Sequence, residues 1–323
     1  MPQTPIDRRI DRRTALRLAG AALIAAPAAA PLLARDEAPA PLLTRAIPSS
    51  GERLPVIGVG TNRYNPTNDA ERASRKAVLA GLAAAGAKLI DTAPSYGESE
   101  QVIGELLAEL GDRPRRFLAT KVTARGGTRD EGLAMLAASR RRLRSDLLDL
   151  VQVHNLSGTA VLLPLLREEL AAKRIRYLGI TTSRDAQYAE FEQVMAAERL
   201  DFVQLDYSIA NRGTAERLLP LAAERGMAVL VNMPFGGPHD GNLFARLKDR
   251  PLPDFAAEIG AASWAQLLLK YILGHPAVTC VIPGMTRVEN LRDNLGAGRG
   301  RLPDAALRRR MEAWWDGEFH GIA

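Results

Sequence analysis

Four side chains with complementary acid and base chemistry stand at the ends of short apolar runs in the first half of the chain. Asp91 ends the run that begins at Leu89, and Tyr96 follows in the next loop. Lys121 and His154 stand near the ends of later runs, within FLATKV and VQVH. Lysine is rare in this sequence, and a lysine that ends an apolar strand needs a partner for its charge. Asp91 can be that partner.

Together these residue types could deliver a proton to a carbonyl oxygen while a hydride reaches the carbonyl carbon. A phenol with a pKa of about 10 is a poor acid at neutral pH, but an adjacent ammonium stabilises the phenolate. Tyr96 would be the acid, Lys121 the charge that tunes it, and Asp91 the counterion that aims Lys121. His154 would hydrogen-bond the substrate oxygen and orient the carbonyl. We therefore predict that these four residues are catalytic.

These residues need a regular scaffold, and the sequence predicts one. Short apolar runs alternate with amphipathic segments of helix length. The predicted strands span residues 55–60, 87–92, 116–122, 148–155, 176–182, 201–207, 227–233 and 277–284. The predicted helices span residues 69–85, 99–110, 128–143, 159–172, 186–196, 214–225, 263–273 and 288–297. Repeated strand-then-helix units favour an α/β fold, a parallel (β/α)₈ TIM barrel whose active residues gather at the C-terminal strand ends.

A doubly wound open sheet is the competing fold. It would carry a G-x-G-x-x-G turn after the first strand, but GVGTNRYNP offers only Gly58 and Gly60 and no helix directly after them. Before that strand, residues 42–55 are typical of a hairpin around residues 49–51, which could cap the N-terminal mouth of the barrel. No linker or repeat divides the remainder, so we predict one barrel domain over residues 42–323.

Motifs from Leu54 to Leu302 resemble those of the aldo-keto reductase superfamily. They are LPVIGVGTN, LIDTAPSYGESEQVIGELL, LATKV, VQVHN, YLGITTS, VQLDYSIANR and VIPGMTRVENLRDNL. The resemblance implies a (β/α)₈ barrel that binds extended NAD(P)H without a Rossmann motif, reduces aldehydes or ketones by hydride transfer, and is a monomer. It also implies that Asp91, Tyr96, Lys121 and His154 are the catalytic tetrad of that superfamily.

The same resemblance implies where the cofactor and substrate bind. Gln204 aligns with the residue that hydrogen-bonds the nicotinamide amide, and the glycine-rich residues 235–242 follow the strand after which the family clamps the pyrophosphate. The implied cofactor contacts are Gly60, Thr61, Thr181, Thr182, Gln204, Asn232, Pro234, Gly236, Gly284, Arg287, Asn290 and Asn294. Substrate choice is expected in the mouth loops, with Tyr64 as a substrate contact and further residues from 156–161 and 234–253.

Some of these positions depart from the family pattern. Thr182 stands where Asn is common, and Asn232 stands where an aromatic residue often stacks on the nicotinamide. Asn232 resembles the sugar and aldose dehydrogenase-like branch. Gly284 and Asn290 replace the Lys and Arg that often hold the adenine ribose phosphate, although Arg287 could supply that charge. NADP is therefore the expected cofactor, with NAD as the alternative.

Three functional hypotheses are consistent with these residues. The first is a reductase of a small carbonyl compound. The second is a sugar or aldose dehydrogenase that works oxidatively, with Tyr96 as the base. The third is a sensor module that binds the cofactor without turnover, although an inactive site has no chemical reason to hold all four tetrad residues. The sequence does not choose the direction of the reaction or name the substrate.

Composition excludes several other classes. The chain has 323 residues and a formal net charge of +6, which falls to +3 without residues 1–28, so the basic balance does not indicate nucleic-acid binding. The four histidines do not recur at metal-ligand spacing with cysteines or acids, so no metal site is expected. The single cysteine, Cys280, rules out an internal disulfide and is expected to be a small core residue.

The N-terminus is typical of an export leader. Residues 1–34 contain a basic segment followed by an Ala-rich apolar segment that is too short to span a bilayer stably. Arg12 and Arg13 resemble the twin-arginine signal, although Ala15 replaces the usual aromatic residue. The sequence thus predicts recognition by the twin-arginine export machinery and a periplasmic protein, tethered to the membrane if the leader stays uncleaved.

Overall fold

The computed structural model describes residues 1–2, 40–237 and 241–319, and its main unit spans residues 40–323. From residue 3 onward, the leader predicted for residues 1–34 lies outside the described residues, as do residues 238–240 of the predicted glycine-rich loop. The domain limits 1–34 and 42–323 stay predictions. Among the described residues, no helix combines the length and apolar character needed to cross a membrane.

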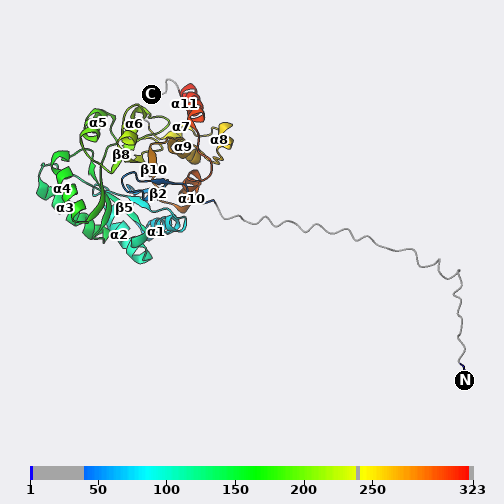
Figure 1. Cartoon of the computed structure of the whole chain (residues 1–323), viewed down its shortest axis with the longest axis horizontal. Coiled ribbons are helices and arrows are strands. Elements are labelled where there is room, and N and C mark those ends of the chain that lie inside the picture. Colours follow the sequence, from blue (N-terminus) through cyan, green and yellow to red (C-terminus); the bar gives the residue numbers. More distant parts are fainter. Residues whose placement is uncertain (3–39, 238–240, 320–323) are drawn as a thin grey trace. The chain divides into compact units, whose positions relative to one another are not determined.

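The core of the main unit is a parallel sheet whose strands follow one another in chain order (Figure 1). Its strands are β3 (Val59–Gly60), β4 (Leu89–Asp91), β5 (Phe117–Val122), β6 (Leu148–His154), β7 (Ile175–Thr181), β8 (Phe202–Asp206), β9 (Ala228–Asn232) and β10 (Val278–Val281). Two parallel bridges, Ile57 to Val281 and Gly60 to Gly284, join the first strand region to the last. This closure confirms the predicted (β/α)₈ TIM barrel.

A helix follows each strand of the barrel, as predicted. These helices are α1 (Asp69–Ala84), α2 (Ser99–Leu110), α3 (Arg129–Leu143), α4 (Thr159–Ala171), α5 (Tyr188–Ala197), α6 (Leu218–Glu224), α9 (Trp264–Leu273) and α10 (Val288–Ala297). Side chains of Asn68, Thr128 and Ser263 accept backbone N–H bonds at the starts of α1, α3 and α9, which explains where these helices begin.

Shorter elements complete the chain. They are the 3₁₀ turns η1 (Arg113–Arg115), η2 (Asp185–Gln187) and η3 (Gly213–Ala215), and the helices α7 (Leu243–Arg246), α8 (Phe255–Glu258) and α11 (Ala305–Phe319). The helix predicted over residues 214–225 is split between η3 and α6. In α11, Trp315 and Phe319 are buried and Trp314 stacks on Trp264, so these aromatic residues hold α11 on the barrel.

The predicted hairpin closes the N-terminal mouth of the barrel. Strand β1 (Thr44–Ala46) pairs antiparallel with β2 (Arg53–Pro55), and Gly51 adopts the positive φ that the turn requires. Ile47 and Leu54 have no exposed surface. They pack against a cluster of side chains inside the barrel, including Phe117, Tyr177 and Phe202 near the starts of their strands. Hairpin and barrel therefore share one apolar core.

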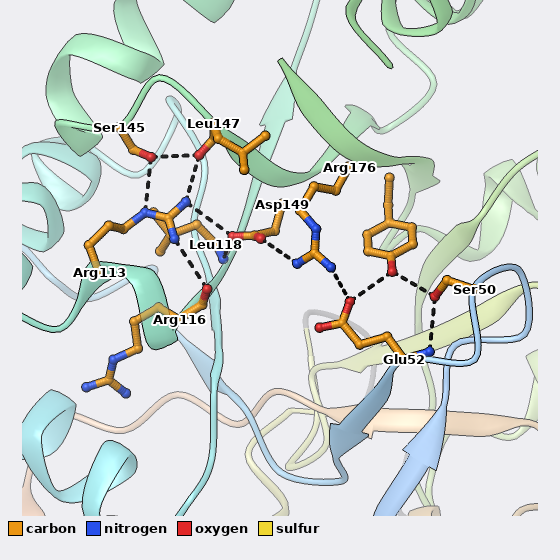
Figure 2. Close-up of polar contacts among 10 residues, drawn as sticks. Ser50, Glu52, Arg113, Arg116, Leu118, Ser145, Leu147, Asp149 and Arg176 are labelled. Atoms are coloured by element: carbon orange, nitrogen blue, oxygen red, sulfur yellow. Dashed lines mark hydrogen bonds and ion pairs between the residues drawn. The ribbon is translucent and has the colours of Figure 1, made fainter. Parts of the chain in front are cut away.

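A polar network lies beside the hairpin (Figure 2). The carboxylate of Asp149 accepts hydrogen bonds from the Leu118 amide at 2.8 Å, from Arg113 at 3.2 Å and from Arg176 at 2.9 Å. Arg176 also pairs with Glu52 of the hairpin. The hydroxyl of Tyr177 donates to the same glutamate at 2.9 Å. The network therefore ties the hairpin to strands β5, β6 and β7 at the end of the barrel opposite the strand C-termini.

Candidate active site

A cavity of about 380 Å³ opens at the C-terminal ends of the barrel strands. Asp91, His154, Thr181 and Asn232 are the last residues of β4, β6, β7 and β9, and all four line it. The full lining is Gly60, Thr61, Asn62, Arg63, Asp91, Tyr96, Lys121, His154, Asn155, Thr181, Ser183, Gln204, Asn232, Met233, Pro234, Phe235, Gly236, Ile282 and Gly284. The topology thus brings the four predicted catalytic residues into one cavity, because parallel strands end at the same mouth.

A buried ion pair lies at the floor of this cavity. The ammonium of Lys121 donates to Asp91 Oδ1 at 2.7 Å and to the Thr92 carbonyl at 2.8 Å. Burial raises the pKa of Asp91, and the ammonium beside it acts in the opposite direction. Burial alone would lower the pKa of Lys121, but the carboxylate of Asp91 and the hydroxyl of Tyr96 more than offset it, so that pKa is raised. Lys121 is therefore held as a cation.

Tyr96 and His154 lie over this ion pair. The ammonium of Lys121 is 5.0 Å from the centroid of the Tyr96 ring, and the rings of Tyr96 and His154 meet edge to face with centroids 6.2 Å apart. Burial lowers the pKa of His154 to about 4, and the charges of Lys121, Arg184 and Arg125 add to the effect. His154 is thus a neutral imidazole at pH 7, able to donate one N–H bond into the cavity.

Left-handed backbone occurs at two edges of the cavity. Asn155 and Leu156, directly after His154, have φ values of 50° and 56°, and Met233 has a φ of 47° directly after Asn232. Non-glycine residues adopt this conformation rarely and at an energetic cost, and such strain concentrates at functional sites. The chain therefore adopts this costly conformation directly after His154 and Asn232, two residues that line the cavity.

The predicted cofactor residues divide into two groups. Those that line the cavity are Gly60, Thr61, Thr181, Gln204, Asn232, Pro234, Gly236 and Gly284. Thr182 is buried and does not line the cavity, and its hydroxyl donates to Gln187 at 2.7 Å. Arg287, Asn290 and Asn294 belong to the start and body of α10 and do not line the cavity. The structure thus brings eight of the twelve predicted contacts to the cavity wall.

The cavity wall carries polar atoms without a partner and one glycine with open space beside it. Asn232 Oδ1 and Asp91 Oδ2 are buried and have no hydrogen-bond partner within the described residues. A side chain at Gly60 would meet the Ile282 carbonyl at 2.7 Å, so packing explains that glycine. At Gly284, in contrast, the nearest atom would be 3.8 Å away, so packing does not account for the missing side chain. An open glycine lets a ligand approach the backbone closely.

The position of Tyr64 differs from the prediction. The sequence predicts that Tyr64 contacts the substrate, but its side chain has no exposed surface and does not line the cavity. Its hydroxyl donates to the Met285 carbonyl at 3.1 Å. The aromatic ring packs in the core beneath the mouth, which the sequence does not distinguish from a position in the loop above it.

Sequence reasoning also missed part of the lining. The missed residues are Asn62, Arg63, Asn155, Ser183, Met233 and Ile282, whereas Phe235 lies in the loop 234–253 that the sequence predicts at the mouth. Each is within one or two residues of a strand end or of a predicted site residue, and that adjacency is the signal that could have identified them.

Other chemistry is not indicated by the described residues. Between residues 40 and 237 and between 241 and 319, no group of three or more His, Cys, Asp or Glu is arranged to hold a metal ion. Cys280 is fully buried in the barrel interior, and burial raises the pKa of its thiol. A thiol kept protonated in the core is a poor nucleophile.

Two enzymes of Escherichia coli are similar in sequence to most of this chain. A methylglyoxal reductase of Escherichia coli is 29% identical over 259 residues, which cover 79% of this chain and 89% of the relative. A pyridoxine 4-dehydrogenase of the same organism is 27% identical over 250 residues, covering 71% of this chain and 83% of the relative.

Solved structures show the same fold. The holo form of an aldo-keto reductase from Bacillus halodurans matches with a TM-score of 0.69 and 23% identity, over 84% of this chain and 96% of the other. An aldo-keto reductase from Klebsiella pneumoniae in complex with NADPH matches with a TM-score of 0.67 and 23% identity, over 85% of this chain and 95% of the other. The family model described as the aldo/keto reductase family matches residues 56–314. The chain therefore belongs to the aldo/keto reductase family and is an NAD(P)-dependent oxidoreductase.

Proposed function

We propose that the protein reduces an aldehyde or ketone with NADP(H), and that Tyr96 donates the proton to the carbonyl oxygen. The observation that carries the proposal is the placement of Lys121, 2.7 Å from Asp91 Oδ1 and 5.0 Å from the Tyr96 ring centroid. A cation in that position stabilises the phenolate that forms as the proton leaves. Asp91 and Lys121 form a buried ion pair, so the ammonium of Lys121 stays beside Tyr96 and does not move out into solvent.

His154 has a separate role in this proposal. It is neutral at pH 7, since burial lowers its pKa to about 4, and it lines the cavity beside Tyr96. A neutral imidazole can donate a hydrogen bond to the substrate oxygen without competing for the proton that Tyr96 gives. The pair of donors would orient the carbonyl group for attack at carbon.

NADP(H) supplies the hydride when it is bound. The polar wall formed by Thr181, Gln204 and Asn232 would hold the carboxamide of its nicotinamide. Gly284, where a Cβ would meet no atom nearer than 3.8 Å, leaves room for the cofactor beside the protein backbone. Arg287 and Asn290 at the start of α10 would meet the ribose phosphate, because a helix N-terminus favours an anion. Solved aldo-keto reductases from Klebsiella pneumoniae are described in complex with NADPH and with NADP, which supports this choice over NAD.

The oxidative direction is the second candidate. It uses the same residues with Tyr96 as the base, and Asn232 in place of a stacking aromatic residue favours it. One relative is named a pyridoxine 4-dehydrogenase, an alcohol-oxidising activity. Initial rates measured with NADPH plus methylglyoxal, and with NADP⁺ plus aldoses, would decide the direction. The hypothesis of a sensor that binds the cofactor without turnover is less favoured, because all four tetrad residues line the cavity.

The first test is Tyr96→Phe, which keeps the ring and removes the acid. We expect kcat to fall by about 10²- to 10⁴-fold, the usual contribution of a general acid, with the affinity for NADPH unchanged. NADPH fluorescence measures the affinity, and loss of absorbance during carbonyl reduction measures kcat. A variant that keeps wild-type kcat would show that Tyr96 is not the acid.

We further propose that the protein is exported by the twin-arginine machinery with its cofactor already bound. Arg12 and Arg13 of the leader and the single cysteine support this, since such a chain can fold before export and needs no disulfide. The test is mass spectrometry of nucleotide released by denaturing protein purified from the periplasm. Stoichiometric NADP(H) is the expected result, and an empty protein or one confined to the cytoplasm would contradict it.

A further inference from the structure

Gln187 connects two loops at the mouth of the barrel, and the mechanism above does not use it. It ends the 3₁₀ turn η2 after β7, is half-buried, and does not line the cavity. Its amide nitrogen Nε2 donates to the backbone carbonyl of Asn155 at 2.9 Å. Its amide oxygen Oε1 accepts a bond from the Thr182 hydroxyl at 2.7 Å. One side chain therefore ties the loop after β6 to the loop after β7.

The partners of Gln187 fix the orientation of its amide. A backbone carbonyl accepts hydrogen bonds and donates none, so the nitrogen of the amide must face Asn155. The oxygen then faces Thr182, whose hydroxyl accepts a bond from the Arg184 amide at 3.2 Å and gives its own proton to Gln187. A rotation of the amide by half a turn would place two oxygens against each other at Asn155. The bonds from Arg184 to Asn155 thus have one consistent direction.

The turn that Gln187 holds is costly for the backbone. Asn155 and Leu156 have φ values of 50° and 56°, and residues other than glycine occupy this left-handed region at an energetic cost. Such residues persist only where neighbouring groups hold them. The amide of Asn155 donates to the Thr181 carbonyl at 2.8 Å, and its carbonyl accepts the bond from Gln187. Both backbone groups of Asn155 are therefore bound to the segment formed by the end of β7 and η2.

His154 depends on this turn for its direction. It is the last residue of β6 and directly precedes Asn155. Within the residues that the structure describes, no group hydrogen-bonds its imidazole. Its ring meets that of Tyr96 edge to face, with centroids 6.2 Å apart. The imidazole is therefore directed by the backbone that carries it and by the side chains packed around it, so a change in the turn would move it relative to Tyr96.

We propose that Gln187 is a positioning residue for the reaction, because it holds the left-handed turn after His154 and so keeps the imidazole beside Tyr96. This inference rests on the proposed function, in which His154 donates a hydrogen bond to the carbonyl oxygen of the substrate. Thr182 supports Gln187 by binding its amide oxygen. Gln187 thus acts on catalysis through His154 and does not touch the substrate, since it lies outside the cavity lining.

The main test is Gln187→Met, which keeps a side chain of similar length and removes both hydrogen bonds. We expect kcat for carbonyl reduction to fall by roughly 10- to 100-fold, because small displacements of a catalytic group are costly. The Kd for NADPH, measured by fluorescence titration, should stay at the wild-type value, which also shows that the variant is folded. Gln193→Met, on the exposed surface of α5, is the matched control and should leave kcat and Kd unchanged.

A second variant, Gln187→Glu, isolates the bond to Asn155. It keeps an acceptor for the Thr182 hydroxyl and replaces the donor with a carboxylate oxygen. It should therefore lower kcat at least as much as Gln187→Met, again with the wild-type Kd for NADPH.

Two measurements separate the positioning of His154 from general support of the fold. His154→Gln should lower kcat by itself, and Gln187→Met should have little further effect in that background, since Gln187 acts through His154. The imidazole signals of His154 in NMR spectra, assigned by their absence in His154→Gln, should shift in Gln187→Met and stay in place in Gln193→Met.

A wild-type kcat in Gln187→Met, an equal loss of kcat with and without His154, or a parallel loss of NADPH affinity would overturn the inference. In these cases the proposed function would stand as long as Tyr96→Phe and His154→Gln lower kcat. A His154→Gln variant with wild-type kcat would instead overturn the role proposed for His154, and this inference with it.

Discussion

Asp91 shows how one carboxylate serves several neighbours in the cavity. It accepts a bond from Lys121 at 2.7 Å, lies near the amide of Gln204, and has a second oxygen with no partner in the described part of the chain. Among the described residues that line the cavity, it is also the only acidic one. The carboxylate of Asp91 and the hydroxyl of Tyr96 both raise the pKa of Lys121, so its charge depends on these two groups.

Replacing Asp91 with Asn should shift the pH dependence of the reaction. Without the carboxylate, only Tyr96 still opposes the desolvation that lowers the pKa of Lys121, so the lysine loses its proton at a lower pH. We expect kcat to fall by about tenfold at neutral pH and the alkaline limb of its pH profile to move to lower pH. Steady-state rates of carbonyl reduction across pH measure this. The exposed Asp185→Asn is the control, and an unmoved limb in Asp91→Asn would contradict the assignment.

At the scale of elements, the attachment of the hairpin β1–β2 to strands β5, β6 and β7 depends on Asp149 (Figure 2). This nearly buried carboxylate accepts bonds from Arg113, Arg176 and the Leu118 amide. Removing one partner of a buried charge network leaves other charges uncompensated, which typically costs about 3–5 kcal/mol. We expect Asp149→Ala to lower the free energy of unfolding by roughly 3 kcal/mol in urea titrations.

A matched control is Glu168→Ala, which breaks an ion pair with Arg129 in which both side chains are more than half exposed. Such surface pairs contribute about 0–1 kcal/mol, so this variant should be near wild type. The Kd for NADPH should be unchanged in both variants, because Asp149 lies at the opposite end of the barrel from the cavity. Equal losses in the two variants would show that the Asp149 network does not hold the hairpin.

At the scale of the whole molecule, two histidines link stability to pH. Burial lowers the pKa of His154 and of His275 to about 4, and nearby arginines add to both shifts. In the unfolded chain a histidine has a pKa of about 6.5. Between these values the unfolded state binds more protons, so the free energy of unfolding falls as pH decreases from about 6.5 toward 4.

Urea unfolding at about pH 6.5 and about pH 5 should reveal this dependence before the carboxylates with lowered pKa begin to contribute. The double variant His154→Gln with His275→Gln should have a flatter profile over that interval. An equally steep profile in the double variant would assign the dependence to other groups.

The positive charge at the mouth should also affect cofactor binding. Arg63 lines the cavity, and Arg125 and Arg184 lie close enough to His154 to lower its pKa. None of the three forms an ion pair with another residue that the structure describes. NADPH carries several negative charges, so we expect its Kd to rise about threefold or more when salt is increased from low to physiological strength. Arg63→Ala should weaken this dependence, whereas the exposed Arg309→Ala on α11 should not.

Much of the architecture could be predicted from the sequence because the signals are local. Apolar runs and capping residues such as Asn68 and Ser263 set where strands and helices lie, and the strand-helix alternation predicts the barrel. Asp91 and Lys121 could be paired in advance, since parallel strand ends meet at one mouth and a buried lysine needs a counterion.

Only the tertiary structure decided which side chains face the cavity. Tyr64 stands in a mouth loop by sequence, but it turns into the core and bonds to Met285, more than two hundred residues away. Gln187 has no local signal, since its partner Asn155 follows the preceding strand of the barrel. Side-chain direction depends on contacts between distant residues, so the sequence by itself determined the strand ends and their chemistry, and packing determined which groups act together.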